Sequence, residues 1–384
     1  MPDGTPARTI RDIPGLIAAG LARESDRAAL EAVAARYAVA LSPAVAALID
    51  PANPADPIAA QYVPHPDERV TAPDEHADPI ADAPFSPIRG IVHRYPDRVL
   101  LKPLLACPVY CRFCFRREQV GPEGGVLTEA ELAAALAYIA ARPAIREVIL
   151  TGGDPLMLSP RRLRAILGAL ERIPHVETLR IHTRVPVAEP SLVTEPLAEA
   201  LAAEKALWIA VHANHARELS PAARAALGRL VARGIPLLSQ SVLLAGVNDS
   251  EAALEALCRA LIAARVKPHY LHMLDLAPGT ARFRVAVEHA RAASGLARPP
   301  AGPRHPDADP RHPRRARQGA RGGEPSRPRG RGLDRDRSLG GAAHLPGPGC
   351  RPPGKPVTRR PPPPSPTDVR PCPRCRPTRC APAT

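Results

Sequence analysis

Three cysteines, Cys107, Cys111 and Cys114, are the residues whose spacing most directly indicates a chemistry. Three thiolates in one loop can bind three irons of a cubane iron–sulfur cluster. The fourth iron then has no protein ligand and is open to a small molecule. Spacing alone also leaves two simpler interpretations open, namely three unrelated buried thiols or a zinc site that lacks one ligand.

The elements that must position this loop alternate along the middle of the chain. Apolar, partly β-branched runs predict six strands, at residues 99–105, 147–151, 179–183, 207–212, 236–244 and 267–274. Helices are predicted between them, at residues 128–142, 159–172, 191–204, 221–233 and 249–264. Thr128 and Glu131 fit a capping box, and Gly234 fits a helix C-cap. This alternation predicts an α/β fold with a parallel sheet, either an open six-stranded barrel or a flat doubly wound sheet.

Polar residues fall at the carboxyl ends of the predicted strands, where the active sites of parallel barrels lie. The cysteine loop follows the first strand, and Gly152-Gly153-Asp154 follows the second. Two adjacent glycines let a backbone approach a ligand closely, with N–H groups exposed to bind a charged end. Asp275 ends the sixth strand, and an isolated carboxylate in such an apolar setting indicates a cationic partner.

The sequences CPVYCRFCFRR at 107–117 and YLHMLD at 270–275 resemble those of the lysine 2,3-aminomutase family of radical S-adenosylmethionine (SAM) enzymes. The resemblance covers about residues 20–293 and implies a partial (β/α)6 radical-SAM barrel. It also implies a [4Fe–4S] cluster on Cys107, Cys111 and Cys114, with SAM and pyridoxal 5′-phosphate (PLP) as further cofactors. The implied enzyme is an isomerase that interconverts L-lysine and β-lysine through a 5′-deoxyadenosyl radical.

The resemblance also assigns residues to SAM. Gly152, Gly153 and Asp154 match the loop that contacts the amino group of this cofactor. Gln240, at the fifth strand, matches a residue that lines the same cofactor site.

Four further residues match positions that contact the substrate or PLP. Arg116 corresponds to the arginine that binds the carboxylate of lysine, and Asp275 to the aspartate that binds its side-chain ammonium. Arg94 and Arg98 correspond to arginines near the phosphate of PLP. Arginine suits both roles, because its guanidinium binds carboxylate and phosphate in a bidentate manner.

The lysine that anchors PLP in this family is not found in its expected context. The chain has four lysines, Lys102, Lys205, Lys267 and Lys355, and the first three lie in barrel elements. Lys355 lies in a Pro-Pro-Gly-Lys-Pro segment that does not match the family. The PLP lysine is therefore unknown, and an impaired or truncated family member is an alternative.

Several histidines near the strand ends invite a zinc assignment. We interpret them instead as polar residues that line the cavity or as hydrogen-bonded core histidines; they are His182, His212, His215, His269 and His272.

The character of the sequence changes after about residue 294. Residues 299–384 contain 22 prolines and 18 arginines and account for +13 of the net charge of +14. Such a segment cannot form a core, so three domains are expected: a helical extension and linker at 1–90, a radical-SAM core at 91–293, and a low-complexity tail at 294–384. The tail is interpreted as out-of-frame coding sequence, a disordered tail or a nucleic-acid-binding arm.

Localisation and partners follow from composition and from the resemblance. The chain shows neither a signal peptide nor a membrane span, which predicts a cytoplasmic protein with reduced cysteines. The expected partners are L-lysine, a one-electron reductant such as flavodoxin or ferredoxin, and a second copy of the chain. Two alternative functions stay open: an aminomutase that makes β-lysine for elongation factor P, and a nucleic-acid-binding protein that uses the basic tail.

Overall fold

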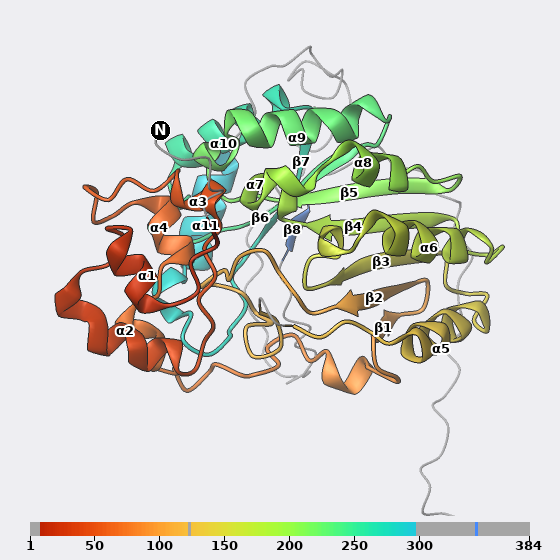
Figure 1. Ribbon diagram of the computed structural model, residues 1–384, viewed down its shortest axis with the longest axis horizontal. Coiled ribbons are helices and arrows are strands. Elements are labelled where there is room, and N and C mark those ends of the chain that lie inside the picture. The colour runs from red at the N-terminus through yellow and green to blue at the C-terminus, as the bar shows by residue number, and fades with distance from the viewer. Residues whose placement is uncertain (1–7, 122–123, 297–341, 345–384) are drawn as a thin grey trace, which may run out of the picture. The chain divides into compact units, whose positions relative to one another are not determined.

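An eight-stranded sheet forms the centre of the fold, and its strands follow one another in chain order (Figure 1). The computed structural model describes residues 8–121, 124–296 and 342–344. Strands β2 to β7 run parallel, whereas β1 and β8 pair antiparallel at the two edges. The strands are β1 (Ile91–Tyr95), β2 (Arg98–Leu104), β3 (Glu147–Gly152), β4 (Thr178–Thr183), β5 (Ala206–His212), β6 (Leu237–Val242), β7 (Val266–His272) and β8 (Ala342–His344).

This strand order distinguishes the two folds that the sequence left open. A doubly wound sheet reverses its strand order at a switch point. No reversal occurs among the described strands, because each parallel strand pairs with its neighbours in the chain. The prediction of an open barrel is therefore confirmed, as are its six strands. The hairpin of β1 and β2, which turns at Pro96 and Asp97, was not predicted.

Helices cover the outer face of the sheet (Figure 1). The capping box of Thr128 and Glu131 is present, and Ser or Thr side chains cap the other long helices. The helix predicted at 191–204 is shorter, because Thr194 caps a helix that begins only at Glu195. The helices around the sheet are α5 (Glu129–Ala140), α6 (Pro160–Glu171), α7 (Val185–Ala188), α8 (Glu195–Ala200), α9 (Pro221–Ala232), α10 (Glu251–Ala263) and α11 (Val287–Leu296).

The two faces of the sheet differ in polarity. Alternate residues such as Leu101 of β2 and Leu150 of β3 are fully buried against the helices, and they belong to the largest apolar cluster. Residues of the opposite, inner face are mostly polar and only partly buried, and they include Arg98, Lys102, Glu147, Arg180, His182, His212, Gln240, Tyr270 and His272. A polar inner face suits a ligand cavity rather than a packed barrel core.

The N-terminal extension is more structured than the predicted helices and coil. Its helices build a second apolar cluster, which includes Val109 of the cysteine loop. The predicted linker contains a further helix, α4, because Asp56 caps a helix that has Pro57 at its first position. The elements of the extension are α1 (Ile13–Ala18), α2 (Arg27–Ala34), α3 (Pro43–Ala46), α4 (Pro57–Tyr62) and the 3-10 turns η1 (Glu24–Asp26), η2 (Pro66–Arg69) and η3 (Ala83–Phe85).

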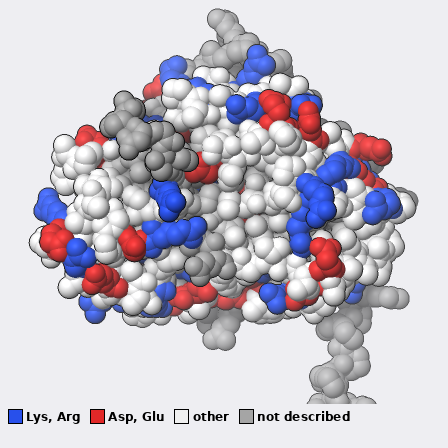
Figure 2. All heavy atoms as spheres, in the orientation of Figure 1, with Lys and Arg blue, Asp and Glu red and all other residues white. Residues whose placement is uncertain are grey.

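Most of the tail that the sequence analysis singled out, including Lys355, lies outside the described residues. On the face of the molecule in Figure 2, positive and negative side chains are interspersed, without a continuous basic surface. No helix in the described part of the chain is both long enough and apolar enough to cross a bilayer.

Candidate active site

The three cysteines of the predicted cluster lie together in the loop that follows β2. Their thiols are close enough to influence one another, since neighbouring thiolates contribute to the raised pKa of Cys107 and of Cys111. Burial is the largest cause in each case and raises the pKa of the Cys111 thiol to about 11. Iron binds the thiolate, so cluster assembly must displace the thiol protons. The sequence-predicted ligands are thus brought together.

The arrangement does not resemble a site for one metal ion. Among the described residues, no three His, Cys, Asp or Glu side chains converge on a point where a single ion would bind. A cubane cluster has a different requirement, because each thiolate binds a different iron and the sulfurs stand further apart. The three thiols therefore fit the donor set of a cluster with one open iron.

The glycine loop after β3 packs against the start of the cysteine loop. A Cβ atom on Gly153 would lie 2.2 Å from the carbonyl oxygen of Ala106, so only glycine fits there. The N–H of Gly153 donates to the carbonyl of Leu104, and the N–H of Asp154 donates to that of Ala106. These N–H groups are therefore not free for a ligand, contrary to the expectation from the sequence.

The carboxylate of Asp154 is also fully engaged within the protein. One oxygen accepts hydrogen bonds from the Thr183 hydroxyl (2.7 Å) and the Leu156 N–H (3.1 Å). The other oxygen accepts from the N–H groups of Arg184 (2.6 Å) and Val185 (3.0 Å). A carboxylate has about four acceptor sites, so Asp154 joins the ends of β3 and β4 instead of offering a free charge.

Arg116 is nearly buried and already has a carboxylate partner. Its guanidinium donates to one oxygen of Asp82 from Nε (3.2 Å) and Nη2 (2.8 Å). Arg94 lies on β1, where its guanidinium reaches the carbonyl of Ala81 (3.0 Å) and the other oxygen of Asp82 (3.5 Å). Two of the arginines predicted to bind anions therefore meet at the carboxylate of Asp82.

Arg98 stands apart from this group, at the amino end of β2. It pairs with Asp97 in the hairpin turn (2.8 Å) and faces Glu147 of β3 (3.5 Å). Arg98 lies in register with Glu147, which places both residues on the inner face of the sheet. The structure thus does not bring Arg98 to the cysteine loop.

Asp275 follows β7 at the same end of the sheet as the cysteine loop. Burial raises the pKa of its carboxyl to about 6, while Arg116 opposes this shift and Asp82 adds to it. Asp275 and Arg116 therefore interact, although 159 positions separate them in the sequence. The two residues predicted to hold opposite ends of a substrate are brought together.

Neutral histidines line the inner face near Gln240. Burial, followed by Arg180, lowers the pKa of His182 to about 3, and burial lowers the pKa of His212 and of His272. The Nε2 atoms of His182 and His212 are buried without a hydrogen-bond partner in the described part of the protein. Gln240 of β6 lies in register with His212 of β5. Two unpaired imidazole nitrogens thus lie on the inner face, near the predicted cofactor residue.

Sequence reasoning missed two buried glutamates that surround the cysteine loop. Glu218 binds Arg184 (2.6 Å), and Glu68 binds Arg112 (2.6 Å) and Arg117. Both glutamates close a capping box whose first residue is histidine, in the patterns HPDE at 65–68 and HARE at 215–218. The His-x-x-Glu spacing was a visible signal, but capping boxes are usually sought with Ser or Thr.

The described residues do not complete a site for PLP. Lys205 donates to the carbonyl of Leu170 (3.4 Å) near the outer helices, and Lys267 is exposed at the start of β7. Lys102 lies on β2, where burial and then Arg116 lower the pKa of its ammonium. None of the three lies in the segment in which the resemblance places the anchoring lysine.

Comparisons with known proteins show which proteins the chain is similar to. Residues 101–257 match the radical SAM superfamily. The L-lysine 2,3-aminomutase of Acetoanaerobium sticklandii is 40% identical over 249 residues, which are 65% of this chain and 60% of that protein. The Bacillus subtilis enzyme of the same name is 38% identical over 64% of this chain and 52% of its own length. The corresponding enzyme of Escherichia coli K12 is 41% identical over 62% of this chain and 70% of its own length.

The chain thus spans between about half and 60% of the length of the first two of these relatives. Among solved structures, a radical SAM methyltransferase from Sphaerobacter thermophilus is 22% identical, with a TM-score of 0.38 over 54% of this chain and 65% of that one.

Proposed function

The chain belongs to the lysine 2,3-aminomutase family of the radical SAM superfamily, and from this premise we propose that it is an isomerase that interconverts L-lysine and β-lysine. The observation that carries the proposal is the meeting of three thiols with Arg116 and Asp275 at the carboxyl ends of parallel strands. This set combines the donors for a cluster with two opposite charges that match the two ends of a free amino acid.

In this proposal, Cys107, Cys111 and Cys114 hold a [4Fe–4S] cluster, and SAM binds at its open iron. When bound, the cluster and SAM supply a 5′-deoxyadenosyl radical for hydrogen abstraction. Carbonyl oxygens of Gly152 and Gly153 are the acceptors we propose for the SAM ammonium, because an ammonium donates hydrogen bonds and a backbone N–H cannot accept them. Gln240 is proposed to line the same site.

Arg116 and Asp275 are proposed to bind the carboxylate and the side-chain ammonium of lysine. The Asp82 pair fixes two nitrogens of the Arg116 guanidinium, which orients its remaining Nη1. The ammonium of lysine favours the ionised form of Asp275, whose own burial opposes ionisation. The neutral histidines near Gln240 add no positive charge that would repel the substrate.

PLP is the further cofactor of the proposed reaction, with Arg94 and Arg98 proposed near its phosphate. No lysine in the described residues lies where the family would anchor it. That observation favours a second candidate function: a family member that assembles the cluster and cleaves SAM but forms no β-lysine. Production of β-lysine for elongation factor P is a third possibility, and a neighbouring gene for a lysyl-transferase-like protein would distinguish it.

The test is a product assay on the anaerobically purified, iron- and sulfide-reconstituted chain, with SAM, PLP, a reductant and isotopically labelled L-lysine. Labelled β-lysine together with 5′-deoxyadenosine supports the first candidate. Formation of 5′-deoxyadenosine without β-lysine supports the second. A fully loaded cluster with neither product contradicts both. Flavodoxin or ferredoxin is the proposed electron donor, and gel filtration of the same sample tests the proposed homo-oligomer.

A further inference from the structure

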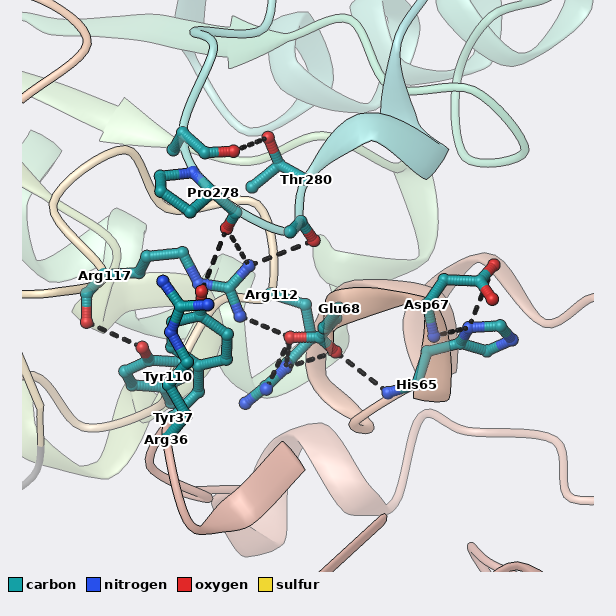
Figure 3. A network of polar contacts seen from close by, with 12 residues as sticks. Arg36, Tyr37, His65, Asp67, Glu68, Tyr110, Arg112, Arg117, Pro278 and Thr280 are labelled. Carbon is teal, nitrogen blue, oxygen red and sulfur yellow. Dashed lines mark hydrogen bonds and ion pairs between the residues drawn. The ribbon is translucent and has the colours of Figure 1, made fainter. Parts of the chain in front are cut away.

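A single buried carboxylate lies behind the cysteine loop, between two of its arginines (Figure 3). Glu68 of η2 accepts hydrogen bonds from Nε (2.9 Å) and Nη2 (2.6 Å) of Arg112, and from Nη2 of Arg117. The side chains of all three residues are fully buried. Hydrogen bonds between ionised groups away from water are strong, and leaving one such group unpaired is costly.

The two arginines lie on either side of Cys114 in the sequence. Arg112 lies between Cys111 and Cys114, and Arg117 lies three residues beyond Cys114. Arg112 is tied to the N-terminal extension twice more, through Nη1 to the carbonyl of Ala38 (2.7 Å) and through its N–H to the carbonyl of Gln61 (2.8 Å). The conformation of the thiol loop therefore depends on the N-terminal extension.

A third segment joins at the same point, after β7. Nη1 of Arg117 donates to the carbonyls of Pro278 (3.1 Å) and Gly279 (3.2 Å). Gly279 has a φ of +71°, and a Cβ there would lie 2.3 Å from the carbonyl oxygen of Glu68. Only glycine allows this contact, so η2, the cysteine loop and the segment that follows Asp275 are locked together around Glu68.

The charges in this group do not balance. Arg282 also lies near Glu68, since Glu68 raises its pKa while burial, Arg112 and Arg117 lower it to about 10. Glu68 thus faces three guanidinium groups, of which two belong to the cysteine loop or adjoin it. Buried positive charge beside a cluster favours the more negative, reduced form and so raises its reduction potential. Glu68 acts in the opposite direction.

We propose that Glu68 is a positioning residue for the cluster loop and that its charge lowers the reduction potential of the cluster, which makes the reduced cluster a stronger reductant. The inference rests on the cluster site of the proposed function. It assigns the N-terminal extension, which lies outside the matched radical SAM residues 101–257, a part in electron transfer.

The experiment compares reduction potentials of the reconstituted full-length chain by a redox titration followed by electron paramagnetic resonance (EPR). Glu68→Gln keeps the shape of the side chain but removes its charge, so the potential should rise. Arg117→Gln removes one positive charge beside the cysteine loop and should lower the potential. Shifts of opposite sign cannot come from simple loosening of the loop, which would act in one direction.

Glu75→Gln is the matched control. Glu75 is equally buried in the same extension and binds Arg284 (2.9 Å) and the N–H of Gly279 (2.9 Å), but no residue of the cysteine loop. The reduction potential of the cluster in Glu75→Gln should equal that in the wild type. Unchanged potentials in Glu68→Gln and Arg117→Gln, or shifts of the same sign, would overturn the proposal.

Two other outcomes are informative. If Glu68→Gln binds less iron than Glu75→Gln, the positioning role is supported, and the potential of Arg117→Gln decides the electrostatic role. If the wild-type chain binds no cluster, the proposed function itself is contradicted. If the cluster is loaded but its potential is the same in wild type, Glu68→Gln and Arg117→Gln, only the role of Glu68 is contradicted.

Discussion

The guanidinium of Arg116 donates two hydrogen bonds to one carboxylate oxygen of Asp82, and this pair links the cysteine loop to the linker before β1. The backbone N–H of Asp82 donates a hydrogen bond to the carboxylate of Asp78 (2.8 Å). The residue before Asp82 is Ala81, whose φ is +53°. A left-handed conformation at alanine costs on the order of 1 kcal/mol. The linker backbone is therefore strained at Ala81, directly before the aspartate that binds Arg116.

We predict that Asp82→Asn weakens binding of lysine. A charge-assisted hydrogen bond contributes about 1.5–3 kcal/mol, so loss of the orientation of Arg116 should raise KM by about tenfold or more. The measurement is KM for β-lysine formation, with Asp74→Asn as an exposed control that pairs with Arg284. A fall in KM would show instead that Asp82 competes with the substrate for Arg116.

Gly153→Ala should prevent the glycine loop from packing on the cysteine loop. Its Cβ would lie 2.2 Å from a backbone oxygen, which cannot move without displacing the residues that lead to Cys107. We expect loss of most cluster loading, measured as iron per chain after reconstitution. Gly228→Ala on α9, where no atom lies within 4 Å of the new Cβ, should load fully and add up to about 1 kcal/mol of helix stability. Equal loading of the two variants would contradict this prediction.

Asp275 predicts a pH dependence of the stability of the metal-free chain. Its folded-state pKa is raised to about 6, so its contribution to stability is greatest below about pH 4 and is lost as the pH rises through 6. The shift corresponds to about 3 kcal/mol at pH 7.5. Urea unfolding at pH 4.5 and 7.5 should show that Asp275→Asn stabilises the chain more at the higher pH than at the lower pH. Asp67→Asn, an exposed control, should not show this difference between the two pH values. Equal pH profiles for Asp275→Asn and wild type would refute the raised pKa of Asp275.

The buried pair of Arg184 and Glu218 should contribute strongly to stability. Glu218 also accepts the N–H groups of Asn214 and His215 (2.8 Å each), so Glu218→Gln removes the charge that balances Arg184. We expect a loss of about 3–5 kcal/mol in the free energy of unfolding, measured by urea titration. Glu255→Gln, which breaks the exposed pair with Arg259, should cost less than about 1 kcal/mol. A similar small loss in both variants would show that burial does not matter here.

Much of the barrel could be predicted because its signals are local. The parallel strands are short apolar runs between capped helices. The cysteines follow β2, Asp275 follows β7 and Gln240 lies in β6, which are the strand positions that the sequence predicted. The hairpin strand β1 was missed, because Ile91–Tyr95 is short and Pro96 follows it at once.

The missed parts of the site depend on partners distant in sequence. Glu68 and Arg112 are separated by 44 positions, and Glu218 and Arg184 by 34, and no spacing rule connects such pairs. For Asp154, a local motif predicted a role that contacts made by the fold alter. Its motif predicted a ligand contact, but the four donors that occupy its carboxylate come partly from β4 and the following turn, which only the fold brings near.

The most direct test of the central claim is EPR of the reduced, reconstituted chain before and after addition of SAM. We expect a [4Fe–4S] signal that shifts with SAM, and loss of this signal in Cys107→Ala, Cys111→Ala and Cys114→Ala. Cys258→Ala, on α10 and away from the loop, should keep the signal. A wild-type chain without a cluster signal, or a signal that survives removal of any of the three cysteines and ignores SAM, would contradict the account.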